Sequence, residues 1–127
     1  PAERSVSVGA DPPSDFDLGH GRLAIPRAHD LSGDGTGTLL LTDGHTAGHQ
    51  SVRGVAEEGE FVLCGDCCYL RRTLLDEHLP PFGVDRTRQL AAIRRMKDLQ
   101  RAGATLVFGH DPDQWSTIVS GGLRTGI

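Results

Sequence analysis

The sequence predicts a layered α/β fold, because short apolar strands precede one amphipathic helix, a further strand and a short closing helix. Residues 38–64 contain three short apolar or alternating runs separated by turn residues, which is typical of a sheet. Residues 85–101 repeat apolar side chains at helical spacing, and another apolar run at 104–108 follows. We therefore expect one α/β unit, with its core in residues 38–120.

The composition is that of a globular chain. Apolar residues make up 37% of the 127 positions, and 17 glycines bring this share to about half. This length is enough for one domain or for half of a larger one. The net charge is −4 and no basic stripe is visible, so nucleic acid is not an expected partner. No apolar run approaches the ~18 residues that cross a bilayer, so a membrane is not expected either.

Residues 1–37 are rich in proline, glycine, aspartate and serine, and we expect a loop-rich lead-in with at most short strands or a turn of helix. The start of the chain carries no signal-peptide pattern and no initiator methionine, since the single methionine is Met96. These features favour a processed chain or a fragment of a longer protein.

The individual elements follow from local patterns. A hairpin turn is expected at residues 57–60, and the helix at 85–101 has Asp85 as its N-cap. A short closing helix is expected at 115–119, with Asp113 as its cap. The strands share apolar or alternating runs between turn residues and are expected at 38–42, 50–56, 61–64 and 104–108.

Residues of the metal-ligand type stand where strands begin or end. His45 and His49 precede the strand at 50–56, Asp66 follows the strand at 61–64, and His110 follows the strand at 104–108. A glycine comes directly before Asp66 and before His110, which permits a sharp turn and a close backbone approach. Imidazole and carboxylate are ligands of zinc sites that keep a water. We therefore predict a metal site at one rim of the sheet.

Three runs resemble the metal-binding motifs of metallo-β-lactamase-fold hydrolases. Residues 43–51, Asp-Gly-His-Thr-Ala-Gly-His-Gln-Ser, resemble the third metal motif, and the final Gln-Ser looks like that of the N-acyl homoserine lactonases. Residues 65–69, Gly-Asp-Cys-Cys-Tyr, resemble the segment with the bridging aspartate, and residues 107–111, Val-Phe-Gly-His-Asp, resemble the segment with the last metal histidine. The resemblance runs from about residue 30 to residue 115. It implies that residues 1–127 are the C-terminal half of an αβ/βα sandwich, a mixed sheet with helices on one face.

The resemblance also implies roles for single residues. His49 would ligate one zinc ion, His110 the other, and Asp66 would bridge the two. His45 would support the site without being a ligand. Tyr69 would hydrogen-bond the carbonyl or the developing oxyanion of a lactone substrate, which a metal-activated hydroxide opens to a hydroxy acid. These two zinc ions are the expected cofactors.

Part of the family pattern is missing. The family carries an H-x-H-x-D-H motif in its N-terminal half, and no such motif occurs among the 127 residues. His49, Asp66 and His110 alone are too few to close a dinuclear site, so the isolated chain is expected to be inactive. The expected partners are therefore an N-terminal half of the same fold or a second, self-associated copy of the chain.

Other interpretations remain open. A thioester hydrolase of the glyoxalase II type shares the metal motifs, and a non-catalytic interaction or dimerisation module would also fit a half-domain. Cys64-x-x-Cys67-Cys68 suggests a structural zinc or redox site, although a single C-x-x-C is weak evidence. Three clustered cysteines make a poor disulfide framework, which favours a reducing, cytoplasmic location. Phe82 stands in an apolar loop that could contact the acyl chain of a substrate.

Overall fold

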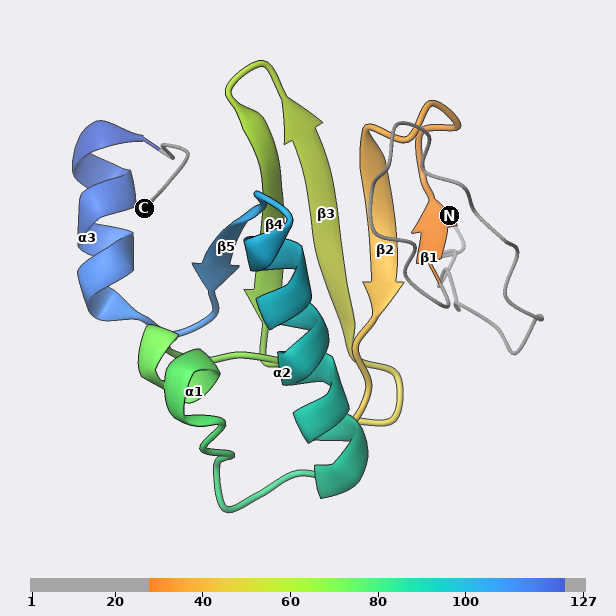
Figure 1. Ribbon diagram of the computed structural model, residues 1–127, viewed down its shortest axis with the longest axis vertical. Coiled ribbons are helices and arrows are strands. Elements are labelled where there is room, and N and C mark those ends of the chain that lie inside the picture. The colour runs from red at the N-terminus through yellow and green to blue at the C-terminus, as the bar shows by residue number, and fades with distance from the viewer. Residues whose placement is uncertain (1–27, 123–127) are drawn as a thin grey trace, which may run out of the picture.

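The computed structural model describes residues 28–122, so most of the lead-in predicted for residues 1–37 lies outside the described residues. Five strands form one sheet in the order β1-β2-β3-β4-β5, accompanied by helices (Figure 1). In chain order the elements are β1 Ala28–Asp30, β2 Gly37–Leu41, β3 Gln50–Ala56, β4 Gly59–Gly65, α1 Arg71–Asp76, α2 Arg86–Arg101, β5 Thr105–Phe108 and α3 Pro112–Gly121.

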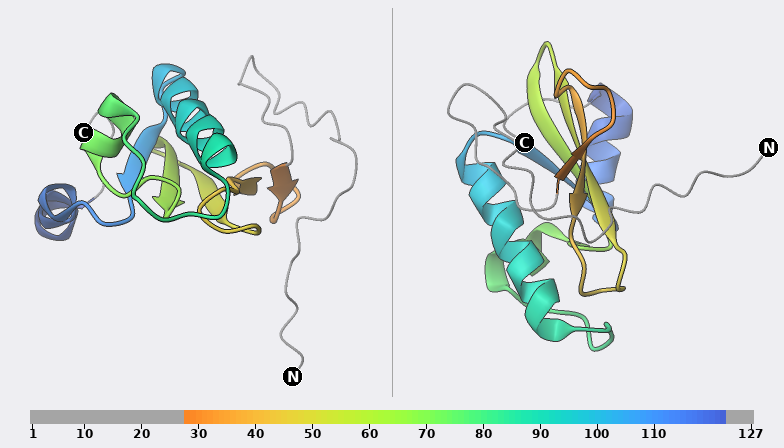
Figure 2. Two further views of the ribbon diagram at one scale, coloured as in Figure 1. Left: turned by 90° about the horizontal axis from the view of Figure 1, so that it is seen from below. Right: turned by 90° about the vertical axis from the view of Figure 1, so that its right-hand side faces the viewer.

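The sheet is mixed, as predicted. Strands β1 to β4 pair antiparallel with their neighbours, whereas β4 and β5 pair in parallel. The connection between these two parallel strands contains α1 and α2, which lie on the same side of the sheet (Figure 2). Helix α3 lies beyond the β5 edge. None of the helices within residues 28–122 has the length and apolar character needed to cross a membrane.

Most of the predicted elements are present. The strand predicted at 50–56 is β3, and the helix predicted at 85–101 is α2, with the Asp85 side chain accepting a hydrogen bond from the N–H of Arg88 at 3.0 Å. The closing helix predicted at 115–119 is present as α3, but its predicted start and cap were wrong. It begins at Pro112, and its N-cap is Asp111 rather than Asp113. Proline suits the first position of a helix because it has no N–H to leave unpaired. Helix α1 was not predicted.

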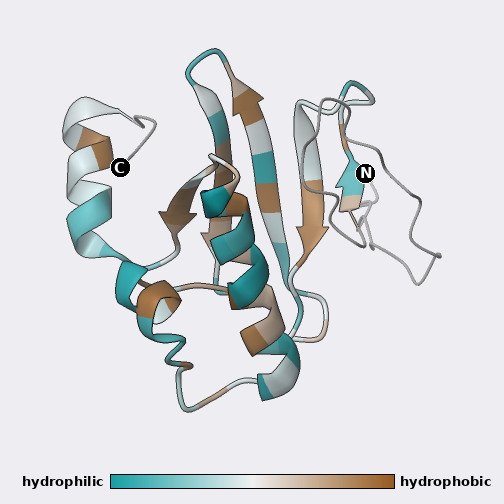
Figure 3. Cartoon of the chain, viewed as in Figure 1, coloured by the Kyte–Doolittle hydropathy of each residue, from teal (hydrophilic) through white to brown (hydrophobic). Residues whose placement is uncertain are grey.

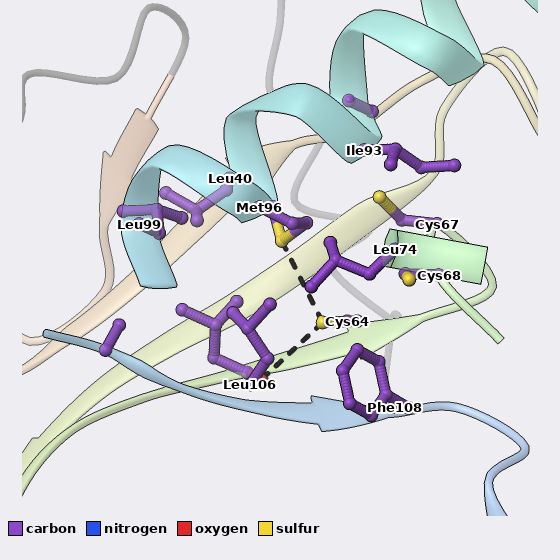
Figure 4. Close-up of a cluster of buried hydrophobic side chains, with 13 residues drawn as sticks. Leu40, Cys64, Cys67, Cys68, Leu74, Ile93, Met96, Leu99, Leu106 and Phe108 are labelled. Atoms are coloured by element: carbon purple, nitrogen blue, oxygen red, sulfur yellow. Dashed lines mark hydrogen bonds between the residues drawn. The ribbon is translucent and has the colours of Figure 1, made fainter. Parts of the chain in front are cut away.

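The core lies between α2 and the face of the sheet that α2 covers. Buried side chains from both layers meet there (Figure 4), and Cys64 lies 3.8 Å from the sulfur of Met96. Apolar positions alternate with hydrophilic ones around α2, and β5 is apolar after its first residue, Thr105 (Figure 3). The cluster comprises Leu40, Val62, Cys64, Cys67, Cys68, Leu74, Ala92, Ile93, Met96, Leu99, Ala104, Leu106 and Phe108.

The three cysteines are free thiols within this core. Burial raises the pKa of Cys67 and of Cys68 to about 12, and it also raises the pKa of Cys64. A thiol must lose its proton to act as a nucleophile or metal ligand. These side chains therefore act as small apolar groups, which does not favour the zinc or redox interpretation of Cys64-x-x-Cys67-Cys68.

The opposite face of the sheet carries an apolar row. Leu39 pairs with Val52, Val52 with Leu63, and Leu63 with Val107, so the four side chains lie side by side across four strands. Leu63 is 42% exposed, whereas Val107 is buried. The described part of the chain thus has a second apolar surface away from α2.

Candidate metal centre

The predicted site residues meet at one end of the sheet, the lower end in Figure 1. Strands β2, β4 and β5 finish at this end and β3 begins there, because β3 is antiparallel to both of its neighbours. The loop between β2 and β3 carries His45 and His49, the segment after β4 carries Asp66, and the segment after β5 carries His110. Residues up to 65 positions apart in the chain are thereby brought to one rim.

The carboxylate of Asp66 lies between two imidazoles. Its Oδ1 is 2.8 Å from Nε2 of His110, and its Oδ2 is 3.4 Å from Nε2 of His45. The Asp66 and His110 side chains are 42% and 60% exposed, whereas His45 is 15% exposed. The site is therefore open to solvent on the His110 side and closed on the His45 side.

His49 approaches Asp66 from the sheet. Its Nε2 accepts a hydrogen bond from the backbone N–H of Asp66 at 3.0 Å, and its Nδ1 lies 2.9 Å from Oγ1 of Thr42. Burial lowers the pKa of His49, and His45 lowers it further, while the carboxylate of Asp66 acts in the opposite direction. The ring is thus neutral near pH 7, which is the form of histidine that binds metals.

Two glycines make this approach possible. Gly65 has a φ of 58°, which side chains rarely permit, and a Cβ at this position would lie 3.0 Å from Nε2 of His49. A Cβ at Gly109 would clash with the backbone carbonyl of Gly65. The prediction that these glycines allow a sharp turn and a close backbone approach is confirmed.

Backbone hydrogen bonds join the segment after β4 to the segment after β5. The N–H of Gly109 donates to the carbonyl of Cys68 at 3.1 Å, and the N–H of His110 donates to the carbonyl of Tyr69 at 2.9 Å. The carboxylate of Asp111 adds a third link by accepting from the N–H of Arg71 at 2.9 Å. These contacts hold His110 beside Asp66.

Two aromatic residues border the cluster. The ring of Tyr69 packs edge-on against that of His110 with 4.5 Å between centroids, and it lies 6.4 Å from the ring of Phe82. Both aromatic rings also contact His45, at 5.7 and 6.2 Å. Burial raises the pKa of Tyr69, and the charge of Asp66 raises it further. The tyrosine therefore stays protonated and able to donate a hydrogen bond.

The donor types suit zinc, but they do not form a complete ligand set. Two imidazoles and a carboxylate are ligands that zinc binds readily. Among residues 28–122, no three His, Cys, Asp or Glu side chains are arranged to hold a metal ion. His49, Asp66 and His110 fit a metal centre in chemistry, and further ligands are needed to complete one.

Three residues of the site were not assigned a role from the sequence. Asp111 precedes a proline, which is a helix-start signal that could have identified it as a cap. Thr42 and Ser51 carry no comparable signal. Thr42 contacts His49 and Ser51 contacts Thr42 only because β2 pairs with β3.

Proteins of known function share part of this sequence. No family model matches the chain. It is 36% identical over 90 residues to N-acyl homoserine lactonase AttM of Azorhizobium caulinodans, covering 68% of this chain and 34% of that protein. It is also 36% identical over 78 residues to N-acyl homoserine lactonase AiiA of Bacillus thuringiensis subsp. kurstaki, covering 60% and 31%. The chain spans about a third of the length of these curated relatives.

Solved structures give the same result. An N-acyl homoserine lactone hydrolase with N-hexanoyl-L-homoserine bound at its catalytic metal centre superposes with a TM-score of 0.63 at 30% identity, covering 71% of this chain and 36% of that one. A probable metal-dependent hydrolase from Staphylococcus aureus shares the fold, with a TM-score of 0.58 at 14% identity. The chain belongs to the metallo-β-lactamase superfamily and is related within it to the N-acyl homoserine lactonases.

Proposed function

We propose that this chain supplies the C-terminal half of a zinc-dependent hydrolase that opens the lactone ring of N-acyl homoserine lactones. The observation that carries the proposal is the position of the Asp66 carboxylate. It lies 2.8 Å from His110, which is 44 positions away, while its backbone binds His49, which is 17 positions away. An exposed carboxylate between imidazoles at a strand end suits metal binding better than a structural role.

The proposed roles follow from these positions. His49 and His110 would each hold one metal ion, and Asp66, which lies between them, would bridge the pair. Zinc bound there would supply a hydroxide near neutral pH by lowering the pKa of a water. The phenol of Tyr69, kept protonated by burial and by Asp66, would donate a hydrogen bond to the lactone carbonyl. Phe82, which is 56% exposed, would contact the acyl chain.

The names of the relatives support the substrate class. Two curated relatives are N-acyl homoserine lactonases, and a solved relative holds an opened lactone product at its metal centre. The side chains that surround Asp66 in this chain include the tyrosine and histidines expected for such a site. A thioester substrate has no comparable support.

The missing ligands would come from a partner. We propose that residues 1–127 form one half-domain and that an N-terminal half with an H-x-H-x-D-H motif completes the site. The apolar row Leu39, Val52, Leu63 and Val107 supports this, because a sheet face of this kind gains stability when a second layer covers it. A self-associated copy could cover the same row. The three unpaired thiols support a cytoplasmic location.

The proposal is tested by reconstitution. Zinc per chain and hydrolysis of N-hexanoyl homoserine lactone are measured for the 127-residue chain, alone and mixed with the N-terminal part of the A. caulinodans relative. We expect turnover only in the mixture, and we expect His49→Ala, Asp66→Ala and His110→Ala each to abolish it with helix content unchanged. Near-full turnover of the lactone by Asp66→Ala would contradict the proposal. So would a mixture that hydrolyses a glutathione thioester but not the lactone.

A further inference from the structure

We propose that Thr42 and Ser51 are positioning residues that fix the tautomer of His49, holding its hydrogen on Nδ1 and leaving Nε2 bare. A continuous series of hydrogen bonds, which we call the relay, links His49, Thr42, Ser51 and Cys64. Nδ1 of His49 lies 2.9 Å from Oγ1 of Thr42, which lies 2.8 Å from Oγ of Ser51, which in turn donates to the backbone carbonyl of Cys64 at 3.0 Å.

The backbone carbonyl of Cys64, the last group of the relay, determines which atom donates in each of its hydrogen bonds. A carbonyl only accepts, so the single hydrogen of the Ser51 hydroxyl is used on Cys64. The hydrogen between the two hydroxyls must then come from Thr42, which leaves Thr42 with none to donate to His49. The remaining bond needs a hydrogen on Nδ1 of His49.

The hydrogen bond at Nε2, on the other side of the His49 ring, independently requires the same tautomer. The backbone N–H of Asp66 points at Nε2 of His49 from 3.0 Å, and an N–H can only donate. Nε2 must therefore present a lone pair. A hydrogen on Nε2 would oppose the N–H of Asp66 and would leave Nδ1 facing an oxygen without a donor.

The surroundings keep water out of the relay. Thr42 and Ser51 are each 1% exposed, and Cys64 is fully buried. Breaking any hydrogen bond of the relay would therefore leave a buried polar group unpaired, which costs stability. The thiol of Cys67 lies beside both hydroxyls, and burial keeps it protonated. A protonated thiol is a weaker hydrogen-bond partner than a hydroxyl or a carbonyl, so it does not change which groups donate and accept in the relay.

The tautomer of His49 would also decide which ring nitrogen can bind a metal, and only this step rests on the proposed function. A histidine ligates a metal through the nitrogen that lacks a hydrogen, and a hydrogen bond made by the other nitrogen decides which one that is. Thr42 and Ser51 would present Nε2 toward Asp66 before any metal arrives. The tautomer itself is a property of the chain without metal.

The test reads the tautomer directly. The full 15N-labelled chain is studied without metal at about pH 8 by long-range 1H–15N NMR, in which a protonated and a bare ring nitrogen resonate far apart. His49→Gln assigns the signal. We expect the wild-type chain to carry its hydrogen on Nδ1, and we expect Thr42→Val to lower the ratio of Nδ1–H to Nε2–H about fivefold, as for the loss of one hydrogen bond. Ser51→Ala, which frees the Thr42 hydroxyl to donate to Nδ1, should act in the same direction.

Matched variants separate this role from simple stability. Thr38 lies in β2, which ends just before Thr42, and it is equally buried, but its hydroxyl has no hydrogen-bond partner, so Thr38→Val should leave the tautomer unchanged. Thr42→Ser keeps the hydroxyl and should keep Nδ1–H. A wild-type chain with its hydrogen on Nε2, or an unchanged ratio in Thr42→Val and Ser51→Ala, would overturn the inference. Because no metal or substrate is used, failure of the lactonase proposal leaves this result intact.

Discussion

The carboxylate of Asp111 accepts a hydrogen bond from the backbone N–H of Arg71 at 2.9 Å, although the two residues are 40 positions apart. Its other oxygen accepts from the N–H of Gln114 at 3.1 Å. Helix α1 begins at Arg71 and α3 begins directly after Asp111. One buried carboxylate therefore caps two helices, and it ties the segment that carries Tyr69 to the segment that carries His110.

Removing this double cap should destabilise the chain. Asp111→Ala leaves two helix N-termini without a side-chain acceptor, and we expect a loss of about 2 kcal/mol in the free energy of unfolding. Urea unfolding followed by circular dichroism measures it. Asp113→Ala is the matched control, because Asp113 is exposed and lies inside the first turn of α3, where its loss costs only about 0.5 kcal/mol. Equal effects of the two variants would contradict the capping role.

The same carboxylate gives a pH dependence with a defined sign. Hydrogen bonds from Arg71 and Gln114 hold the pKa of Asp111 below its ordinary value of 3.8. Its stabilising contribution is therefore present above pH 3.8 and is lost as the pH falls through the lower pKa of the folded state. We expect the difference in unfolding free energy between wild type and Asp111→Asn to shrink between about pH 5 and pH 2. A difference that stays constant over this range would show that Asp111 is not ionised in the fold.

Gly109 should tolerate no side chain. A Cβ there would overlap the carbonyl of Gly65, and relieving the clash would move the segments that carry Asp66 and His110 apart. We expect Gly109→Ala to lower the unfolding free energy by about 2 kcal/mol or more, since backbone cannot rearrange locally. Gly48→Ala is the control, because a Cβ at Gly48 meets nothing within 4 Å. Identical unfolding midpoints for the two variants would refute the close approach.

The cysteines should be unreactive while the chain is folded. With the pKa of Cys67 and Cys68 at about 12, only about one thiol in ten thousand is ionised at pH 8, and the side chains are buried. We expect Ellman's reagent to label no thiol within minutes in buffer and three per chain in urea. Rapid labelling of the folded chain would place a cysteine at the surface and would reopen the redox interpretation.

Tyr69 should matter for turnover but not for metal content. In the reconstituted enzyme, Tyr69→Phe keeps the ring beside His110 and removes only the hydroxyl, so we expect kcat to fall about 10²-fold with zinc per chain unchanged. The comparison uses Phe82→Ala, which should raise KM for long acyl chains more than it lowers kcat. An unchanged kcat in Tyr69→Phe would remove the tyrosine from the proposed chemistry.

Much of the fold could be predicted because its signals are local. The apolar run at Thr105–Phe108 and the helical spacing of Ile93 and Met96 indicate their elements without knowledge of their neighbours. Asp85 was identified as a cap for the same reason. Helix α1 escaped prediction because its six residues contain only two buried positions, too few for a periodic pattern. The cap of α3 was misplaced although the sequence distinguishes the two aspartates, because Asp111 and not Asp113 stands directly before a proline that can begin a helix.

The site, like the fold, could be predicted from the sequence only in part. Residue types and their places at strand ends were enough to propose His45, His49, Asp66 and His110 as candidates, and the resemblance to the lactonase motifs then singled out His49, Asp66 and His110 as the expected ligands. Only the tertiary structure decided that Asp66 lies between His110 and His45, since strand order and register determine which strand ends meet.

The relay from His49 through Thr42 to Ser51 depends on the pairing of β2 with β3, and its last bond depends on the pairing of β3 with β4. Hydroxyl side chains in a strand have no sequence pattern of their own. The sequence by itself determined most of the elements, apart from α1 and the start of α3, and which chemical groups are available. The register of the sheet decided which of those groups touch, because hydrogen bonds act over about 3 Å and their partners here lie 7 to 44 residues apart.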